Sequence, residues 1–279
     1  MDRITKEANP DEQALNELLF ADDQGLVHHS PDSLQEHTDR LNSACKKYGM
    51  SISIPKTETM IVSRSAKTLD ITIDDSILQQ SKEFKYLGSL FTEDGQLNRE
   101  LETRCQKANN VTFMIGPILS HKAVPMAAKR SIINAIFTPT LCYQSQTWSM
   151  NKKMENKITT CEMKCLRRAV NKTRRDKIRN DTIRDMVGTK PILQQIEKQR
   201  LKWFGHLVRM HPSQPALRSY NSQLSGTKPV GRPRRRWIEG VKNTLTKYNT
   251  NLTDATHAAQ NRRPIISPRL LTGISGGKK

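Results

Sequence analysis

The pattern of hydrophobic and polar positions changes character near Gly95. Before that point, apolar residues occur in short runs or in alternation, as at residues 18–20, 25–27 and 69–73, which is typical of β-strands. After it, apolar residues recur every three or four positions, which is typical of amphipathic helices. The chain is therefore predicted to begin as a mixed region of strands and helix and to continue as a mainly helical one.

Helix and turn signals divide the first region into elements. Residues 18–20 and 25–27 flank Asp22 and Asp23, which predicts two buried strands joined by a tight turn. Ser30 is typical of a helix start, and apolar residues at helical spacing follow it as far as Gly49, a natural stop. Further short strands are predicted at residues 52–54, 60–62, 69–73, 77–78 and 84–88.

The second region carries four helical patterns, at residues 127–137, 154–170, 192–210 and 238–247. Pro139 is expected to end or kink the first helix, because proline lacks an N–H group and clashes with the preceding turn. From Pro212 the composition turns to Ser, Gln, Gly and Pro, which predicts a linker.

Charge separates the two regions. The chain has 279 residues and a formal net charge of +19. Residues 1–100 hold 11 Lys and Arg against 18 Asp and Glu, whereas residues 101–279 hold 35 against 9. A separate basic half is the electrostatic footprint of a polyanionic partner, and we predict nucleic acid. The alternative is a basic surface that serves only solubility.

Composition bounds the class of protein. Hydrophobic residues make up 35% of the chain and aromatic residues 5%, which predicts ordered modules joined by solvated stretches. Five cysteines, an odd number, do not suggest a secreted disulfide scaffold. The amino-terminal residues lack the apolar core of a signal peptide, and no apolar run approaches the roughly 20 residues that span a bilayer. We therefore expect an intracellular location, nuclear or cytoplasmic, and no membrane partner.

Asp22 and Asp23 are the sharpest candidates for chemistry. Nucleotidyl transfer needs clustered carboxylates that hold two Mg²⁺ ions about 3.5–4 Å apart. Asp also favours turns for purely structural reasons. Asp74 and Asp75 occupy a similar predicted turn, where we expect no site. An Asp-Asp pair therefore does not identify a catalytic centre by itself.

Seven segments in order give the first pair its context. The first three are similar to the aromatic-Ala-Asp-Asp palm motif of reverse transcriptases, to the next palm motif with its Lys-Thr end, and to the Tyr-Leu-Gly primer grip. The fourth resembles a Leu-Tyr-Gly-Ser-Glu-Thr-Trp thumb segment. The seven are residues 19–23, 48–58, 84–89, 141–148, 175–180, 203–210 and 231–237. In this order they resemble a LINE-like (non-long-terminal-repeat) retrotransposon endonuclease–reverse transcriptase.

The resemblance implies roles at the matching positions. Asp22 becomes the principal metal ligand of the hairpin, with Asp23 as its neighbour, and Mg²⁺ is the implied cofactor. Lys56 is expected near the triphosphate, where it would protonate or neutralise the departing pyrophosphate. The alternative for Lys56 is an exposed lysine at the end of a strand. Tyr86 and Gly88 are expected to hold the primer end, since glycine lets the backbone approach a strand closely.

The resemblance also implies a fold class and an order of domains. The fold is α+β, with a partial palm made of a small antiparallel sheet and a helix, a mainly helical thumb and a basic helical carboxy-terminal region. The expected parts are a disordered amino terminus (1–15), the partial palm (16–91), thumb-like helices (92–150), a basic helical region (151–211), a linker (212–230), a short basic helical segment (231–261) and a disordered tail (262–279).

The family palm also uses an aspartate on an earlier strand. Only 21 residues precede Asp22, and Asp2 and Asp11 lie in polar sequence without a strand pattern. We therefore expect a fragment of an RNA-directed DNA polymerase, a nucleotidyltransferase acting on template and primer, that is inactive by itself. The alternatives are a non-enzymatic RNA- or DNA-binding remnant of a mobile element and a translated fossil without a selected function.

Two basic segments are candidates for nucleic-acid contacts. The first is predicted to follow a phosphate backbone through Arg167, Arg168, Arg174, Arg175, Lys177 and Arg179. Its alternative is a solvated helix face. The second is predicted to grip single-stranded RNA by charge and stacking through Arg232, Arg234, Arg235, Arg236 and Trp237. Its alternative is that Trp237 anchors the helix that follows.

Cys161 and Cys165 lie one helical turn apart on a face that also carries Ile158 and Ala169. No CxxC pair or paired His completes a set of four zinc ligands. Both cysteines are therefore expected in the core.

Overall fold

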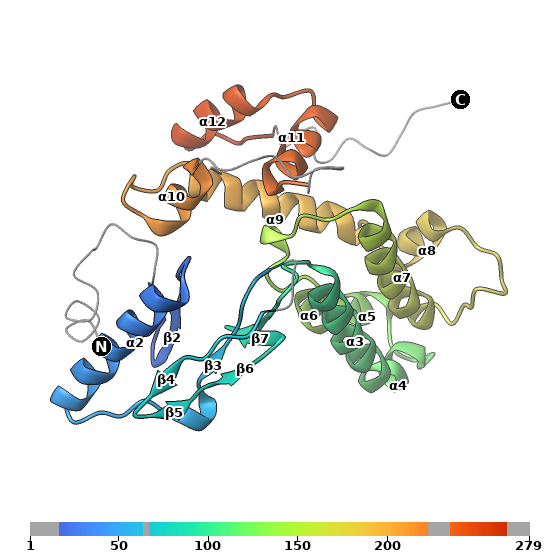
Figure 1. Ribbon diagram of the computed structural model, residues 1–279. Helices are drawn as coiled ribbons and strands as arrows, with labels where there is room; N and C mark the ends of the chain where they lie inside the picture. Colours follow the sequence, from blue (N-terminus) through green and yellow to red (C-terminus); the bar gives the residue numbers. More distant parts are fainter. Residues whose placement is uncertain (1–16, 64–66, 223–234, 267–279) are drawn as a thin grey trace. The chain divides into compact units, whose positions relative to one another are not determined.

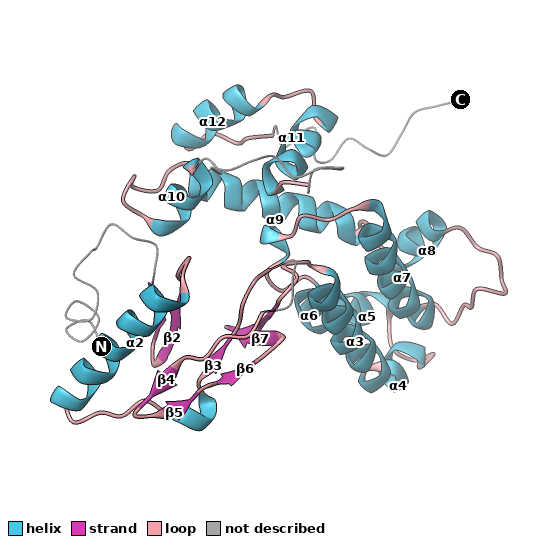
Figure 2. Ribbon diagram, viewed as in Figure 1, coloured by secondary structure: helices cyan, strands magenta, loops and turns pink. Residues whose placement is uncertain are grey.

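A computed structural model describes residues 17–63, 67–222 and 235–266 (Figure 1). The chain divides into two compact units, Met1–Gln96 and Leu97–Lys279. The first unit combines small sheets with one long helix, and the second is helical (Figure 2). This division confirms a mixed α and β composition. The expected disordered terminus at residues 1–15 lies outside the described residues.

The predicted strand–turn–strand at Asp22 and Asp23 is present. Strands β1 (Glu17–Phe20) and β2 (Asp23–Leu26) pair antiparallel. The prediction that both strands are buried is wrong, because Phe20 is 61% exposed and its apolar neighbours on β1 are also exposed. Within the described residues this sheet has only two strands, so no third strand covers the apolar side chains of β1.

The predicted helix after Ser30 is confirmed as α2 (Pro31–Lys47). The Ser30 hydroxyl accepts a hydrogen bond from the Ser33 amide at 3.2 Å, and proline occupies the first turn, where no N–H group is needed. Gly49 follows the last turn with φ of +69°, the left-handed conformation that commonly ends a helix. Local sequence signals thus define both ends of α2.

The other strands of the first unit are shorter than predicted. They form two-stranded sheets in the described residues: β3 (Glu58–Thr59) with β6 (Gln79–Gln80), β4 (Thr72–Ile73) with β5 (Ser76–Ile77), and β7 (Glu83–Tyr86) with β8 (Ser89–Thr92). The β3–β6 pair is parallel, unlike the antiparallel sheet that was expected, and the other two pairs are antiparallel.

Two strand predictions in this unit are wrong. Residues 52–54 form no strand, and the 3₁₀ turn η1 (Ile54–Lys56) begins there because Pro55 fixes a backbone angle suited to a helical first turn. Residues 60–62 are also outside any strand. Their apolar side chains are nevertheless used, since Ile52 and Ile61 pack against a buried cluster centred on Ile71. The alternation of apolar residues therefore identified which side chains pack inward, but not which segments form the backbone hydrogen bonds of a strand.

The second unit is a succession of helices. In the described residues they are α3 (Asn98–Met114), α4 (Gly116–Ser120), α5 (Met126–Ile132), η2 (Ile133–Phe137), α6 (Thr138–Leu141), η3 (Ser145–Thr147), α7 (Lys152–Ala169), α8 (Asn180–Val187), α9 (Ile192–Leu207), α10 (Pro215–Asn221), α11 (Trp237–Lys247) and α12 (Leu252–Gln260). No helix in these described ranges has the length and apolar character required to cross a membrane.

Pro139 changes the helix without ending it. The preceding segment η2 is a π-helix, and Pro139 sits in the first turn of α6 directly after it. A π-turn widens the backbone spiral, which accommodates a residue that donates no hydrogen bond. The expected kink at Pro139 is therefore a one-turn change of helix type.

Two buried clusters hold the helical unit together. The larger one surrounds α7, whose residues Ile158 and Cys165 are fully buried. The smaller one lies between α9, α11 and α12 and includes Phe204 and Leu245, also fully buried. The long helix α9 (Figure 1) contributes to both clusters, with Ile196 in the larger and Phe204 in the smaller. Ile265 and Ile266, in the first residues of the predicted tail, pack against the smaller cluster.

Candidate functional site

The hairpin between β1 and β2 presents both candidate carboxylates to solvent. Phe20 pairs with Asp23, so Ala21 and Asp22 form a two-residue turn, with Ala21 in the left-handed region at φ of +55°. Asp22 and Asp23 are exposed, and within the described part of the chain neither side chain forms a hydrogen bond or an ion pair.

Tyr86 lies against this hairpin, although 60 residues separate them in the sequence. Its hydroxyl donates to the carbonyl oxygen of Leu18 at 3.4 Å. A Cβ at Gly25 would lie 3.9 Å from the Tyr86 ring, an ordinary van der Waals distance, so the ring packs beside β2. Burial raises the pKa of the Tyr86 phenol, and the charge of Asp23 raises it further. The structure thus brings Tyr86 to the hairpin that carries Asp22 and Asp23.

Gly88 belongs to the turn that follows Tyr86. Leu87 and Gly88 both have positive φ, +46° and +82°, and connect β7 to β8 as a two-residue hairpin turn. The Tyr-Leu-Gly segment is therefore a strand end followed by a tight turn.

The predicted turn at Asp74 and Asp75 is present. They connect β4 to β5 with φ of +48° and +62°. Asp74 accepts hydrogen bonds from Lys46 and, at 2.9 Å, from Asn42. These two hydrogen bonds hold the pKa of Asp74 below its ordinary value. The two Asp pairs thus differ in their partners, since Asp74 has partners on α2 and the hairpin pair has none among the described residues.

The residues around Asp22 and Asp23 do not fit a two-metal centre by themselves. In the described ranges no group of three or more His, Cys, Asp or Glu side chains is arranged to hold a metal ion. Lys56, expected near the triphosphate, is exposed at the end of η1. Adjacent carboxylates at one turn supply fewer ligands than two Mg²⁺ ions require.

The first basic segment is a loop with a defined conformation. Arg167 at the end of α7 donates to the carbonyl oxygens of Thr173 and Ile178, at 3.2 and 2.8 Å, and to Asn180 at 3.0 Å. Asp176 accepts from the amide and the hydroxyl of Thr173, at 2.6 and 2.8 Å. Arg167 is therefore a scaffold of this loop.

The basic side chains around that scaffold are exposed. They are Arg168, Lys172, Arg174, Arg175, Lys177 and Arg179. None of the last four forms an ion pair within the described residues. The loop therefore presents unpaired positive charges on a fixed backbone.

The second basic segment is described only in part. Arg232 and Arg234 lie outside the described residues. Arg235 and Arg236 are exposed, and Arg235 donates to the carbonyl oxygen of Met150 at 2.7 Å. Trp237 begins α11, donates from its indole nitrogen to the carbonyl oxygen of Gln146 at 2.7 Å, and is half-buried. These are the contacts expected of an anchoring residue.

The cysteines of α7 are core residues, as predicted. Cys161 and Cys165 are buried, and all five cysteines are free. Burial raises the pKa of Cys142 to about 12 and that of Cys165 to about 11. A hydrogen bond from Cys161 lowers the pKa of Cys105.

Three buried polar residues carry contacts that the sequence did not reveal. Glu162 accepts from Arg184 at 2.8 Å and from the Ile192 amide at 2.8 Å, which joins α7, α8 and α9. His37 is 1% exposed, with its Nδ1 2.9 Å from Nε2 of His28. Arg200 is buried in α9. The sequence signal for such residues is a polar residue placed among the apolar positions of a predicted helix.

Comparison with known proteins gives two matches. The family of reverse transcriptases (RNA-dependent DNA polymerases) matches residues 1–91. An uncharacterized transposon-derived protein of Caenorhabditis elegans is 23% identical over 240 residues, which cover 83% of this chain and 86% of the relative. No solved structure matches. Residues 1–91 are therefore similar to reverse transcriptases, and most of the chain is similar to a transposon-derived protein.

Proposed function

We propose that the chain is a nucleic-acid-binding part of a LINE-like retrotransposon endonuclease–reverse transcriptase. The observation that carries the proposal is the contact between Tyr86 and the hairpin of Asp22 and Asp23. Two segments that resemble separate polymerase motifs meet in space, and both fall within the residues that match the reverse-transcriptase family. Chance similarity of short segments does not require this proximity.

In this proposal the end of a primer strand lies beside Tyr86 and the turn at Gly88. A template–primer duplex with a recessed 3′ end should therefore bind more tightly than a blunt duplex of the same length. Tyr86→Ala should remove this preference, because the ring that contacts the hairpin of Asp22 and Asp23 is lost. The control is Phe91→Ala, which removes an exposed aromatic ring from β8. Equal preference in both variants would contradict the assignment of Tyr86.

We further propose that the chain does not incorporate nucleotides by itself. Two Mg²⁺ ions require carboxylates from more than one turn. Within the described residues, Asp22 and Asp23 have no third acidic side chain arranged with them. Binding of template and primer is then separable from synthesis.

A second candidate function is non-enzymatic binding of RNA or DNA through the basic loop. It is favoured by the exposed, unpaired charges of Arg174, Arg175 and Lys177 on a loop that Arg167 holds. Each phosphate contact to a single strand contributes about −0.7 to the slope of log affinity against log salt. Replacing all three residues by Gln should therefore reduce that slope by about 2.

The matched control for this salt titration replaces three exposed lysines elsewhere in the helical unit, Lys153, Lys198 and Lys202, by Gln. Both triple variants lose the same charge. Fluorescence anisotropy of a labelled single-stranded RNA at several salt concentrations gives each slope. Equal slopes for the two variants would show that the loop makes no specific contribution.

A further inference from the structure

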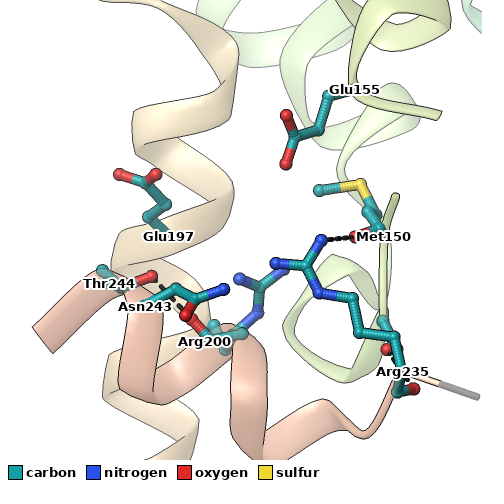
Figure 3. Close-up of a pocket in the computed structure, with 9 residues that line it drawn as sticks. Met150, Glu155, Glu197, Arg200, Arg235, Asn243 and Thr244 are labelled. Carbon is teal, nitrogen blue, oxygen red and sulfur yellow. Dashed lines mark hydrogen bonds between the residues drawn. The ribbon is translucent and has the colours of Figure 1, made fainter. Parts of the chain in front are cut away.

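A small cavity of about 80 Å³ lies between α9 and α11 (Figure 3). Arg200, Thr244 and Met150 are its buried lining residues, and the exposed residues Arg235 and Asn243 also line it. The cavity is large enough for several water molecules or for one small anion. Its lining combines two guanidinium groups with the carboxylates of Glu155 and Glu197.

Arg200 is the most unusual of these residues. It is 6% exposed, and its Nη2 donates to the carbonyl oxygen of Trp148 at 3.1 Å. Its Nε is buried and has no hydrogen-bond partner. Within the described residues Arg200 forms no ion pair. A buried guanidinium that is left without an anion destabilises the fold, so such a residue usually has a counter-charge.

Arg235 adds a second positive charge to the same space. Its Nη1 donates to the carbonyl oxygen of Met150, and Figure 3 shows its guanidinium beside that of Arg200. Burial lowers the pKa of Arg200, and the charge of Arg235 lowers it further, while Glu197 and Glu155 raise it. Two cations thus face one cavity.

The two carboxylates at the edge of the cavity do not neutralise these cations. Glu197 forms an ion pair with Lys247 at 3.0 Å, and Glu155 forms one with Lys152 at 3.3 Å. Each carboxylate is therefore shared between a lysine and the arginines. The four cations Arg200, Arg235, Lys152 and Lys247 outnumber the two carboxylates by two.

Gly240 on α11 provides the room that Arg200 occupies. A Cβ at this position would lie 3.0 Å from Nη1 and 3.2 Å from Cζ of Arg200. A Cβ at this position would require the flexible guanidinium to shift by a few tenths of an ångström. Glycine thus lets Arg200 pass close to α11, although it lowers the helix propensity of that helix.

We propose that this cavity binds a single phosphate group of a nucleic-acid strand. The planar guanidinium group of arginine matches the geometry of phosphate oxygens. A phosphate with one or two negative charges would supply the counter-charge for Arg200 and Arg235. Exposed Arg236 and Lys242 beside the cavity favour a polyanion over a free carboxylate as the source. The inference deepens the proposed nucleic-acid binding and rests on it only for the identity of the strand.

The test measures binding of inorganic phosphate to the full chain by isothermal titration calorimetry. Arg235→Gln should weaken phosphate binding by about tenfold or more, because it removes a charge-assisted hydrogen bond. Lys202→Gln, which loses the same charge at an exposed position of α9 that does not line the cavity, should bind phosphate as the unaltered chain does. Circular dichroism confirms that each variant is folded.

Single-stranded RNA with and without a 5′ phosphate identifies the source of the group. A preference for the 5′-phosphorylated strand that Arg235→Gln abolishes supports a terminal phosphate in the cavity. Equal affinity of the two strands, weakened by Arg235→Gln and not by Lys202→Gln, supports an internal phosphodiester. Absence of phosphate binding, or equal effects of Arg235→Gln and Lys202→Gln, overturns the proposal. Since phosphate binding involves no nucleotide incorporation, the inference fails or succeeds independently of the polymerase origin.

Discussion

Tyr86 shows how one side chain connects two segments that the sequence can only order. Its hydroxyl donates a hydrogen bond to the backbone of β1, and the charge of Asp23 raises its pKa. Neither contact follows from spacing, because both depend on how two separate hairpins pack. The resemblance of each segment to a polymerase motif was visible in the sequence, but their proximity was not.

The first prediction concerns the titration of Tyr86. Burial and Asp23 both raise its pKa, so removing the charge with Asp23→Asn should lower the pKa while leaving it above the ordinary value of about 10. Two-dimensional NMR with ring-labelled tyrosine, recorded from pH 8 to 12, gives the pKa directly. Asp22→Asn is the control, since Asp22 does not contribute to the shift. An unchanged pKa in Asp23→Asn would place Asp23 away from the phenol.

The second prediction ranks the reactivity of the cysteines. A thiolate is the reacting species, so a lowered pKa speeds alkylation and a raised pKa slows it. Cys105 should react with iodoacetamide at pH 8 before Cys142 and Cys165, whose pKa values are about 12 and about 11. Mass spectrometry of peptides after timed quenching gives the order. Reaction of Cys142 first in the folded chain would contradict its burial in the larger cluster.

At the scale of elements, helices were predicted more reliably than strands. The 3.6-residue period of α7 and the caps of α2 are local signals, and both helices lie where these signals placed them. Strand formation depends on partners elsewhere in the chain, so residues 52–54 and 60–62 had a suitable pattern but no strand. The π-turn before Pro139 also lacks a sequence signal of its own.

The third prediction concerns the buried ion pair that joins three helices. Glu162 and Arg184 are 2.8 Å apart and almost fully buried. Glu162→Ala leaves the guanidinium without its buried partner and should lower the free energy of unfolding by about 3–5 kcal/mol. Asp181→Ala removes an exposed partner of the same arginine and should cost no more than about 1 kcal/mol. Urea unfolding followed by circular dichroism at 222 nm compares them; similar losses would contradict the central place of Glu162.

At the scale of the whole molecule, the ordered motifs predicted a resemblance to reverse transcriptases, which the family match over residues 1–91 supports, while charge predicted the class of partner. The excess of basic residues after residue 100 predicted a polyanionic partner without any structure. It could not separate Arg167, which holds the loop, from Arg175, which is exposed. Nor could it identify Arg200, because a charge balance counts a buried arginine and a solvated one alike.

The central proposal is that this chain binds nucleic acid but does not synthesise DNA by itself, although it carries a hairpin that resembles the metal-binding hairpin of reverse transcriptases. Primer extension tests it most directly, with an RNA template, a DNA primer, all four deoxynucleotides and Mg²⁺, at a protein concentration that saturates the template–primer. The account predicts no extended primer for the unaltered chain or for Asp22→Asn, while a complete reverse transcriptase extends the same primer. Extension by the unaltered chain that Asp22→Asn abolishes would contradict the account.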